Sequence, residues 1–204
     1  MKYTLEWNDS TEPLTLILAP LLYLSVRFLI LRKPLPFPIL ALHFLPAILY
    51  ALTQATYYIE PLPVKYNAYI GAYFPELPFA EVPEGTDYGY QKIKDLQRWF
   101  LILGFALYGL LSIRLWYVNR KTFKIPAANF RISKYRFVLF VLIAFFAILC
   151  IMLMVYLNFE DDAGDHYITL FVSAIILTSA IAFISESRFF QHAWLIDKYE
   201  TSSN

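Results

Sequence analysis

Four side chains of metal-binding types lie close together near the last apolar run: Asp161, Asp162, Asp165 and His166. Carboxylate oxygens suit calcium, and carboxylates combined with an imidazole loosely suit zinc. The topology derived below places acidic residues in this loop whether or not it binds a metal. Because ligand types alone define no coordination geometry, we predict no metal site here.

Four ionisable residues lie inside or beside apolar runs, where a charge is costly. His43 lies about one helical turn inside its run, where a neutral imidazole can hydrogen-bond to a neighbouring helix. Arg27, Arg114 and Glu186 all lie near one predicted face of the membrane. Either Glu186 pairs with one of these arginines, or each charged group extends separately to the interface.

Three tyrosines, Tyr66, Tyr69 and Tyr73, recur at helical spacing together with Ile70 in the longest polar segment. They could line a pocket for an external ligand, because long loops often carry function. The aromatic belt at a lipid interface explains the same pattern. Both interpretations stay open at this point.

Catalytic motifs are absent from the sequence. It contains no nucleophile motif, phosphate-binding glycine loop, paired histidine motif or cysteine pair. Three histidines and the single Cys150 leave little from which to build a catalytic centre. We therefore expect no enzyme activity and no cofactor, and we interpret Cys150 as a small packing residue.

The composition predicts the elements that must position these residues. The 204 residues are 59% hydrophobic and 16% charged, with a mean hydropathy of +0.51. A soluble domain is roughly 45–50% apolar and about 25% charged. The excess is concentrated in runs of membrane-spanning length. We predict an all-α, polytopic helical membrane protein, a single domain with a bundle of five transmembrane helices at about 14–31, 39–58, 99–117, 137–157 and 167–184.

The orientation follows from the basic loop at 118–136. The stretch from Arg114 to Arg136 carries seven basic residues and no acid. Such loops stay in the cytoplasm, so the N-terminus is predicted outside and the tail at 189–204 inside. The same bias explains the basic loop without nucleic acid. We expect it to contact anionic lipid headgroups of the bilayer and predict no direct nucleic-acid binding.

The outer loop at 60–98 is predicted to be partly helical. Its tyrosine pattern indicates a short amphipathic helix in the outer interface, which later prolines interrupt. The segment from Tyr90 to Arg98 should lead helically into the third span. Within that span, Gly104 and Gly109 are expected points of close helix packing.

Two short motifs resemble one protein family. They are Pro20 to Arg27 (PLLYLSVR) and Leu42 to Pro46 (LHFLP), and the tail from Lys198 to Ser203 (KYETSS) resembles a linker of the same family. The family is the membrane-anchored bacterial regulators with a seven-helix sensor region and an AraC-type helix-turn-helix domain. Ala19 and Ser25 replace its usual glycine and aromatic residue. The chain lacks the first two helices of the family pattern and the DNA-binding domain.

The resemblance implies a membrane-embedded sensor or anchor module in the bacterial inner membrane. It would pass a signal from an unknown ligand to a cytoplasmic DNA-binding domain absent from this chain, and a homodimer would suit such a regulator. One alternative is a small transporter or channel subunit, which needs a polar path at the midplane. The span centres offer little for such a path beyond Thr53, Gln54, Ser173, Thr178 and Ser179. Another alternative is a structural membrane scaffold.

Overall fold

The computed structural model describes residues 5–86, 88–119, 134–159 and 164–185. This part of the chain contains helices and no strand, which confirms the all-α prediction. The helices are α2 (Glu12–Leu31), α3 (Phe37–Thr53), α4 (Ala55–Ile59), α5 (Leu62–Tyr73), α6 (Gln91–Lys94), α7 (Gln97–Asn119), α8 (Lys134–Asn158) and α9 (Asp165–Ser185).

Prolines and a left-handed residue set the boundary between α2 and α3. Pro13 lies in the first turn of α2, where the missing N–H is not needed. The helix ends at Leu31 and is capped by Arg32, whose φ of 51° is left-handed and whose N–H donates to the Phe28 carbonyl at 2.9 Å. Pro36 then precedes α3 in extended backbone, with φ −55° and ψ 139°. The two helices therefore form the antiparallel hairpin that the sequence predicts.

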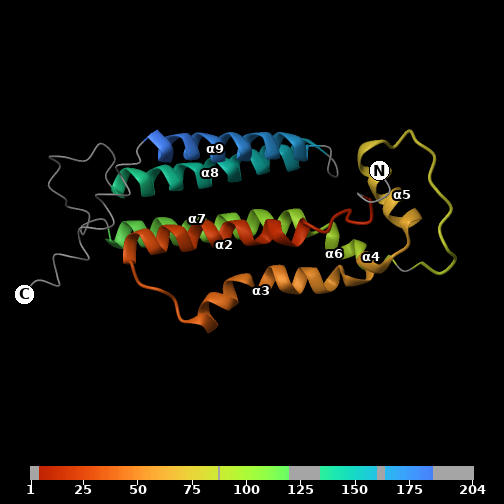
Figure 1. The fold of residues 1–204 in the computed structure, drawn as a ribbon, viewed down its shortest axis with the longest axis horizontal. Helices are drawn as coiled ribbons and strands as arrows, with labels where there is room; N and C mark the ends of the chain where they lie inside the picture. Colours follow the sequence, from red (N-terminus) through yellow and green to blue (C-terminus); the bar gives the residue numbers. More distant parts are fainter. Residues whose placement is uncertain (1–4, 87, 120–133, 160–163, 186–204) are drawn as a thin grey trace, which may run out of the picture.

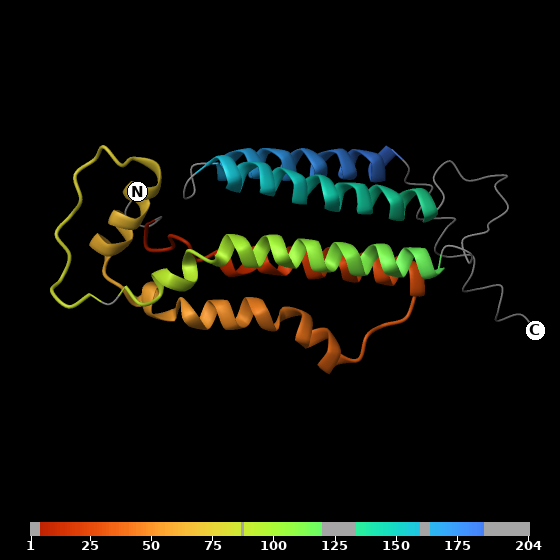
Figure 2. The same cartoon turned by 180° about the vertical axis from the view of Figure 1, so that it is seen from behind.

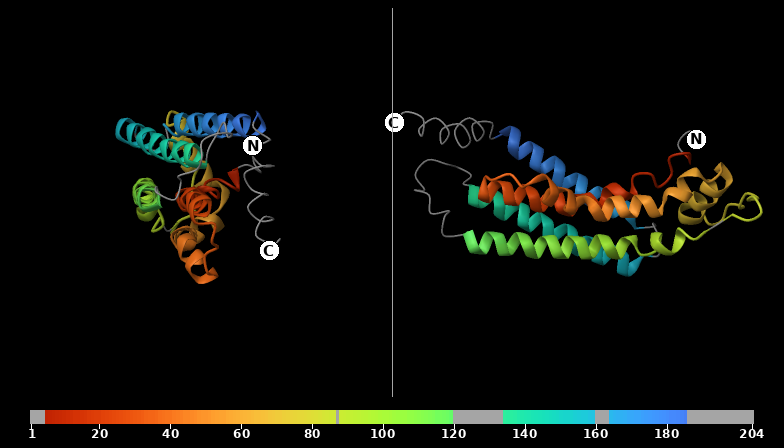
Figure 3. Two further views of the ribbon diagram at one scale, coloured as in Figure 1. Left: turned by 90° about the vertical axis from the view of Figure 1, so that its left-hand side faces the viewer. Right: turned by 90° about the horizontal axis from the view of Figure 1, so that it is seen from below.

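The long helices lie side by side, with α2 at the centre (Figure 1). Their direction alternates along the chain, so the neighbours α2 and α7 run parallel to each other. Helix α2 contacts α3, α7 and α8, and α8 also contacts α7 and α9. Seen from behind, α3 lies along α2 on the side away from the α8–α9 pair (Figure 2). The end-on view shows the same order, with α2 between α3 and α8 (Figure 3).

Three helices are long and apolar enough to cross a membrane: Glu12–Leu31, Gln91–Asn119 and Val138–Asn158. Two shorter apolar helices, Phe37–Thr53 and Asp165–Thr178, accompany them. Leu42, Leu103 and Leu170 on the surface of the bundle are 63%, 63% and 70% exposed. Apolar surface of this extent is typical of a protein that contacts lipid. The class of helical membrane protein is thus supported, whereas the count of five crossings stays a prediction.

Aromatic packing joins α7 to α8 in the main core. Phe105 and Phe145 are buried, with ring centroids 5.3 Å apart and planes at 65°. A Cβ on Gly109 would lie 3.3 Å from Phe146 and 3.4 Å from Phe145, so Gly109 is the close-packing point that the sequence predicts. A Cβ on Gly104 would meet nothing within 4 Å. The same prediction for Gly104 is therefore wrong, because this glycine faces no neighbouring helix closely.

Four of the five predicted spans match helices of the structure within three residues at each end. The second differs, because α3 ends at Thr53 and the short α4 follows after Gln54. Gln54 is 1% exposed, and its amide donates to the Tyr90 carbonyl at 3.4 Å. This polar contact between distant segments coincides with the interruption of the helix that apolar composition alone would continue to Tyr58.

One end of the bundle is covered, and we call it the capped end. There α2, α7 and α9 begin, α3 and α8 end, and α4, α5 and α6 lie beyond them (Figure 1). The far end is opposite, where residues 32–36 join α2 to α3. Residues 120–133 of the basic loop predicted at 118–136, residues 160–163 of the acidic loop and the tail at 189–204 lie outside the described residues.

Candidate functional site

Lys94 on α6 is the centre of a polar cluster at the capped end. Its ammonium group pairs with the Asp9 carboxylate and lies 3.5 Å from Glu12 Oε1. It also lies 5.6 Å from the ring centroid of Tyr57 on α4, within the range of a cation–π contact. A segment before α2, the start of α2, α4 and α6 thus meet at one cation.

Two further hydrogen bonds extend this cluster. The Tyr50 hydroxyl on α3 donates to Glu12 Oε2 at 2.7 Å, and Asn8 Nδ2 donates to the Tyr57 hydroxyl at 2.8 Å. Glu12 therefore interacts with both α3 and α6. Its carboxylate also lies in the first turn of α2, where the helix dipole favours negative charge.

The charge of Lys94 is stabilised by its partners. Burial alone lowers the pKa of a lysine, but the carboxylates of Asp9 and Glu12 outweigh burial and raise the pKa of Lys94. Lys94 therefore remains a cation across the physiological pH range. Burial also raises the pKa of Tyr90, which keeps its phenol neutral.

A second lysine fixes the residues before α2. Lys65 on α5 is 6% exposed and donates to the carbonyl oxygens of Glu6 at 3.1 Å and Tyr58 at 2.7 Å. Asn67 on the same helix exchanges two hydrogen bonds with the backbone of Ala80, at 2.8 and 2.7 Å. These bonds hold both the first described residues and the proline-rich loop against α5.

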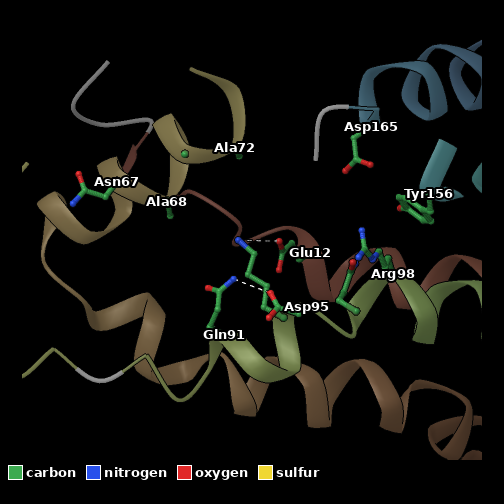
Figure 4. Close-up of a pocket in the computed structure, with 12 residues that line it drawn as sticks. Glu12, Asn67, Ala68, Ala72, Gln91, Asp95, Arg98, Tyr156 and Asp165 are labelled. Atoms are coloured by element: carbon green, nitrogen blue, oxygen red, sulfur yellow. Dashed lines mark hydrogen bonds and ion pairs between the residues drawn. The ribbon is translucent and has the colours of Figure 1, made fainter. Parts of the chain in front are cut away.

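Figure 4 shows the residues that line a hollow beside this cluster. The volume of the hollow is about 590 Å³. Asn67, Ala68 and Ala72 of α5 form one side, and Arg98, Tyr156 and Asp165 form the other (Figure 4). The remaining lining residues come from the starts of α2 and α7, from α5 and from α6: Glu12, Gly71, Gln91, Lys94, Asp95 and Gln97. Segments of six helices, α2, α5, α6, α7, α8 and α9, and the Asp95 turn therefore build one polar hollow.

An adjoining hollow of about 550 Å³ carries the aromatic side chains. It shares Glu12, Gln97, Tyr156 and Asp165 with the first hollow. Its other lining residues are Trp7, Asn8, Asp9, Thr11, Thr15, Tyr69, Tyr73, Phe74 and Leu101. Gln97 donates to the Thr15 hydroxyl at 3.0 Å, which joins the start of α7 to α2 at this wall.

The structure brings together two of the three tyrosines that the sequence analysis considers either as a ligand surface or as part of an aromatic belt. Tyr69 and Tyr73 line the aromatic hollow, with ring centroids 5.3 Å apart. Tyr66 is half-buried and does not line either hollow. Their helix, α5, is present as predicted, but its buried residues include Lys65 beside Val64 and Ile70. Its placement in a lipid interface stays a prediction.

His43 lies in a cluster of three rings between helices. Its Nδ1 is 3.0 Å from the Tyr108 hydroxyl on α7, and Tyr23 on α2 lies against both rings at 5.7 and 5.6 Å. This is the kind of contact across helices that the position of His43 predicts. The cluster joins α2, α3 and α7, so packing of helices is its evident role.

The arginines near the far end differ in their surroundings. Arg27 donates from a terminal guanidinium nitrogen to the Lys33 carbonyl at 2.8 Å, so it reaches the turn after α2. Arg114 is exposed on α7. Glu186 lies outside the described residues, so both alternatives, pairing with an arginine and separate extension to the interface, stay predictions.

The candidate metal ligands do not form a group in the described part of the chain. Asp161 and Asp162 lie outside it, Asp165 lines both hollows, and His166 packs against the Tyr167 ring at 3.9 Å. No group of three or more metal-binding side chains occurs among the described residues.

Sequence reasoning missed Lys65, Lys94, Arg98 and the role of Asp165. One signal was present in the sequence, because these basic residues lie in a segment that the positive-inside rule assigns to the outer side. A basic residue on that side needs a partner or a function. The sequence alone could not identify Asp9 as the partner of Lys94, because the two residues are 85 positions apart.

Comparisons with known proteins identify no relative that could assign this site. No family model, curated protein or solved structure matches the chain. The functional interpretation therefore depends on the geometry of the capped end and on the short motifs described above.

Proposed function

We propose that the chain is a membrane-embedded sensor module with five transmembrane helices. The capped end faces the outside, and the far end faces the cytoplasm of a bacterial cell. The polar hollow at the capped end carries this proposal, because the starts of α2, α7 and α9 and the end of α8 line it. A ligand there would contact the helices whose packing forms the bundle.

Helix α9 is the element we assign to transmission. It begins at Asp165 in the wall of both hollows and runs to Ser185 at the far end. Its partly buried residues pack on the main core: Ile168, Phe171, Val172 and Ile175. A ligand that binds two arrangements of α9 with different affinities would shift the population between them. The tail that follows would carry this shift into the cytoplasm.

The AraC-type resemblance supports the output of the module. It rests on the motifs at Pro20 to Arg27 and Leu42 to Pro46, and it makes the cytoplasmic partner a helix-turn-helix domain. A helix-turn-helix coding region in frame downstream of the chain would favour this output. Homodimerisation stays a prediction.

A transporter is less well supported by the polar residues of the helices. Thr178 donates to the Ala174 carbonyl at 2.7 Å, and Thr53 donates to the Tyr50 carbonyl at 2.7 Å. Both hydroxyls are used within their own helices. Gln54 is buried and bonded to Tyr90 rather than lining a path. Substrate-dependent uptake by vesicles holding the chain alone would favour transport instead.

Cysteine accessibility tests the orientation. Cys150→Ala supplies a background without thiols, since Cys150 is the single cysteine. In intact cells, Leu77→Cys should react with a membrane-impermeant maleimide, whereas Lys33→Cys and Ser203→Cys should react only after permeabilisation. Labelling of position 203 from outside, or of positions 33 and 77 from the same side, would contradict the proposal.

Transmission is tested without any ligand. A fluorophore at Ser185→Cys reports on the far end of α9, and Arg98→Gln alters the hollow. The emission should change with Arg98→Gln and stay unchanged with Lys92→Gln, which removes an exposed charge on α6 that lines neither hollow. The same emission from the labelled Ser185→Cys protein and from its Arg98→Gln and Lys92→Gln variants would show that the two ends are not coupled.

A further inference from the structure

We propose that the aromatic hollow at the capped end binds a quaternary ammonium group, the cation of free choline and of the phosphatidylcholine headgroup. The inference rests on the proposed sensor function and names the class of its ligand. The volume of the hollow, about 550 Å³, lies in the range of small-molecule sites.

Aromatic side chains from three segments line this hollow. Trp7 precedes α2, Tyr69, Tyr73 and Phe74 lie at the end of α5, and Tyr156 lies near the end of α8. The ring centroid of Tyr69 is 5.3 Å from that of Tyr73 and 5.9 Å from that of Phe74. Figure 4 places Tyr156 on the side opposite α5. Several aromatic rings around one cavity are the usual recognition element for a quaternary ammonium group.

The charge of the wall favours a cation. Asp9, Glu12 and Asp165 line the aromatic hollow, and no Lys or Arg is among the described residues that do. Lys94 pairs with Asp9 and Glu12, so two carboxylates against one ammonium still leave a net negative charge. A cavity with walls of one sign attracts the opposite charge. The polar hollow is less suitable for a cation, because Lys94 and Arg98 both line it.

The existing contacts of these acids favour a quaternary over a primary ammonium group. Asp9 and Glu12 already interact with Lys94, and Glu12 also accepts from the Tyr50 hydroxyl. Asp165 has an interaction within the chain as well. A primary ammonium must donate its N–H groups, so it would compete for acceptors already in use. A quaternary ammonium has no N–H and binds through its contact with aromatic rings.

The rings belong to two parts of the molecule that a sensor could move relative to each other. Tyr69 and Tyr73 lie on α5, which covers the capped end, whereas Tyr156 lies on α8 of the bundle. A cation held between these rings would favour the arrangement in which α5 and α8 are close. Such a difference in affinity between two arrangements is what a sensor requires of its ligand.

Three probes separate the charge from the shape and from the N–H groups. Choline carries the charge and the N-methyl groups, 3,3-dimethyl-1-butanol has the same shape without the charge, and ethanolamine has the charge without the methyl groups. Isothermal titration calorimetry uses the full chain in nanodiscs of phosphatidylethanolamine and phosphatidylglycerol, which contain no quaternary ammonium. Choline should bind at least about tenfold more tightly than either analogue.

Variants assign the cation to the rings. Tyr69→Leu should weaken choline binding by about fivefold, whereas Tyr69→Phe keeps the ring and should retain the affinity. Tyr66→Leu is the matched control, because Tyr66 is also a half-buried tyrosine of α5 but lines neither hollow. Trp7→Leu gives a second test on another segment. Trp7 is 73% exposed, so its replacement should weaken choline binding by a similar factor without unfolding the protein.

Lipid composition separates the two sources of the cation. Phosphatidylcholine is added to the nanodiscs, and the choline titration is repeated. A lipid headgroup that reaches the hollow should compete and weaken the binding of added choline, whereas a site for soluble cations alone should bind choline equally in both bilayers. Both results support the ligand class, and the difference between them identifies its source.

Several outcomes would overturn the assignment. They are absence of choline binding in nanodiscs without phosphatidylcholine, equal binding of choline and either analogue, and equal effects of Tyr69→Leu and Tyr66→Leu in proteins that still unfold cooperatively. The accessibility and fluorescence tests of the sensor function use no ligand. If they succeed and choline fails to bind, the ligand class alone is wrong.

Discussion

Lys94 interacts with residues of three other segments through a single ammonium group. Removing it would leave the carboxylates of Asp9 and Glu12 close together without their cation, at a site where the Lys94 side chain is 16% exposed. Exposed ion pairs contribute about 0–1 kcal/mol, whereas breaking a buried pair costs roughly 3–5 kcal/mol.

We therefore expect Lys94→Gln to lower the free energy of unfolding by about 2 kcal/mol, between those limits. Lys92→Gln on the same helix should change it by less than about 0.5 kcal/mol, as exposed substitutions usually do. Chemical unfolding in detergent micelles, followed by tryptophan fluorescence, measures both. Equal effects of the two variants would show that the ion pairs contribute nothing.

The hydrogen bond between His43 and Tyr108 makes a second prediction at this scale. Such bonds between membrane helices contribute on average about 0.6 and at most about 1.7 kcal/mol. A double-mutant cycle with His43→Phe and Tyr108→Phe should give a coupling energy in that range. Tyr23→Phe keeps its ring against both partners and should show little coupling with either. A coupling of zero would mean that shape alone holds the three rings together.

At the scale of elements, the lengths of the apolar runs correctly predicted four of the five long helices but not the end of α3. Runs of apolar residues fixed α2, α7, α8 and α9, because the hydrogen bonding of each helix is internal and depends on local sequence. The end of α3 coincides with Gln54 and its contact with Tyr90, 36 positions later. No local pattern contains that contact. The same limit applies to the site, where Tyr69 and Tyr73 followed from spacing but Arg98 and Asp165 did not.

The contact between α7 and α8 depends on the size of one residue. A side chain at Gly109 would press on Phe145 and Phe146, whereas Gly104 on the same helix has open space. We expect Gly109→Leu to destabilise the protein by about 1–3 kcal/mol through overpacking. Gly104→Leu should be neutral or slightly stabilising, since leucine favours helix over glycine. Thermal unfolding in detergent compares them, and a larger effect at position 104 would contradict this packing.

At the scale of the whole molecule, the helices differ in length. The 17 residues of α3 rise about 25 Å at 1.5 Å per residue, whereas a typical hydrocarbon core is about 30 Å thick. The 25 residues of α8 rise about 37 Å and can tilt to fit. A bilayer that accommodates this protein should therefore be thin beside α3.

Bilayer thickness should consequently affect stability. Each ångström of mismatch costs a fraction of a kcal/mol, so the thermal unfolding temperature should fall as lipid acyl chains lengthen beyond the span of α3. Nanodiscs made from a series of lipids of increasing acyl length measure this dependence. An unfolding temperature that rises steadily with thickness would show that α3 does not end where the structure places it.

The bonds that hold the residues before α2 also determine when this region can be completed. Asn8, Asp9 and the Glu6 carbonyl bind partners at positions 57, 94 and 65. During synthesis, residues 6, 8 and 9 are made well before the residues to which they bond. In the proposed topology, the contacts of the leading segment therefore stay incomplete until α6 has been synthesised, and the polar hollow is completed only after the start of α9 has followed.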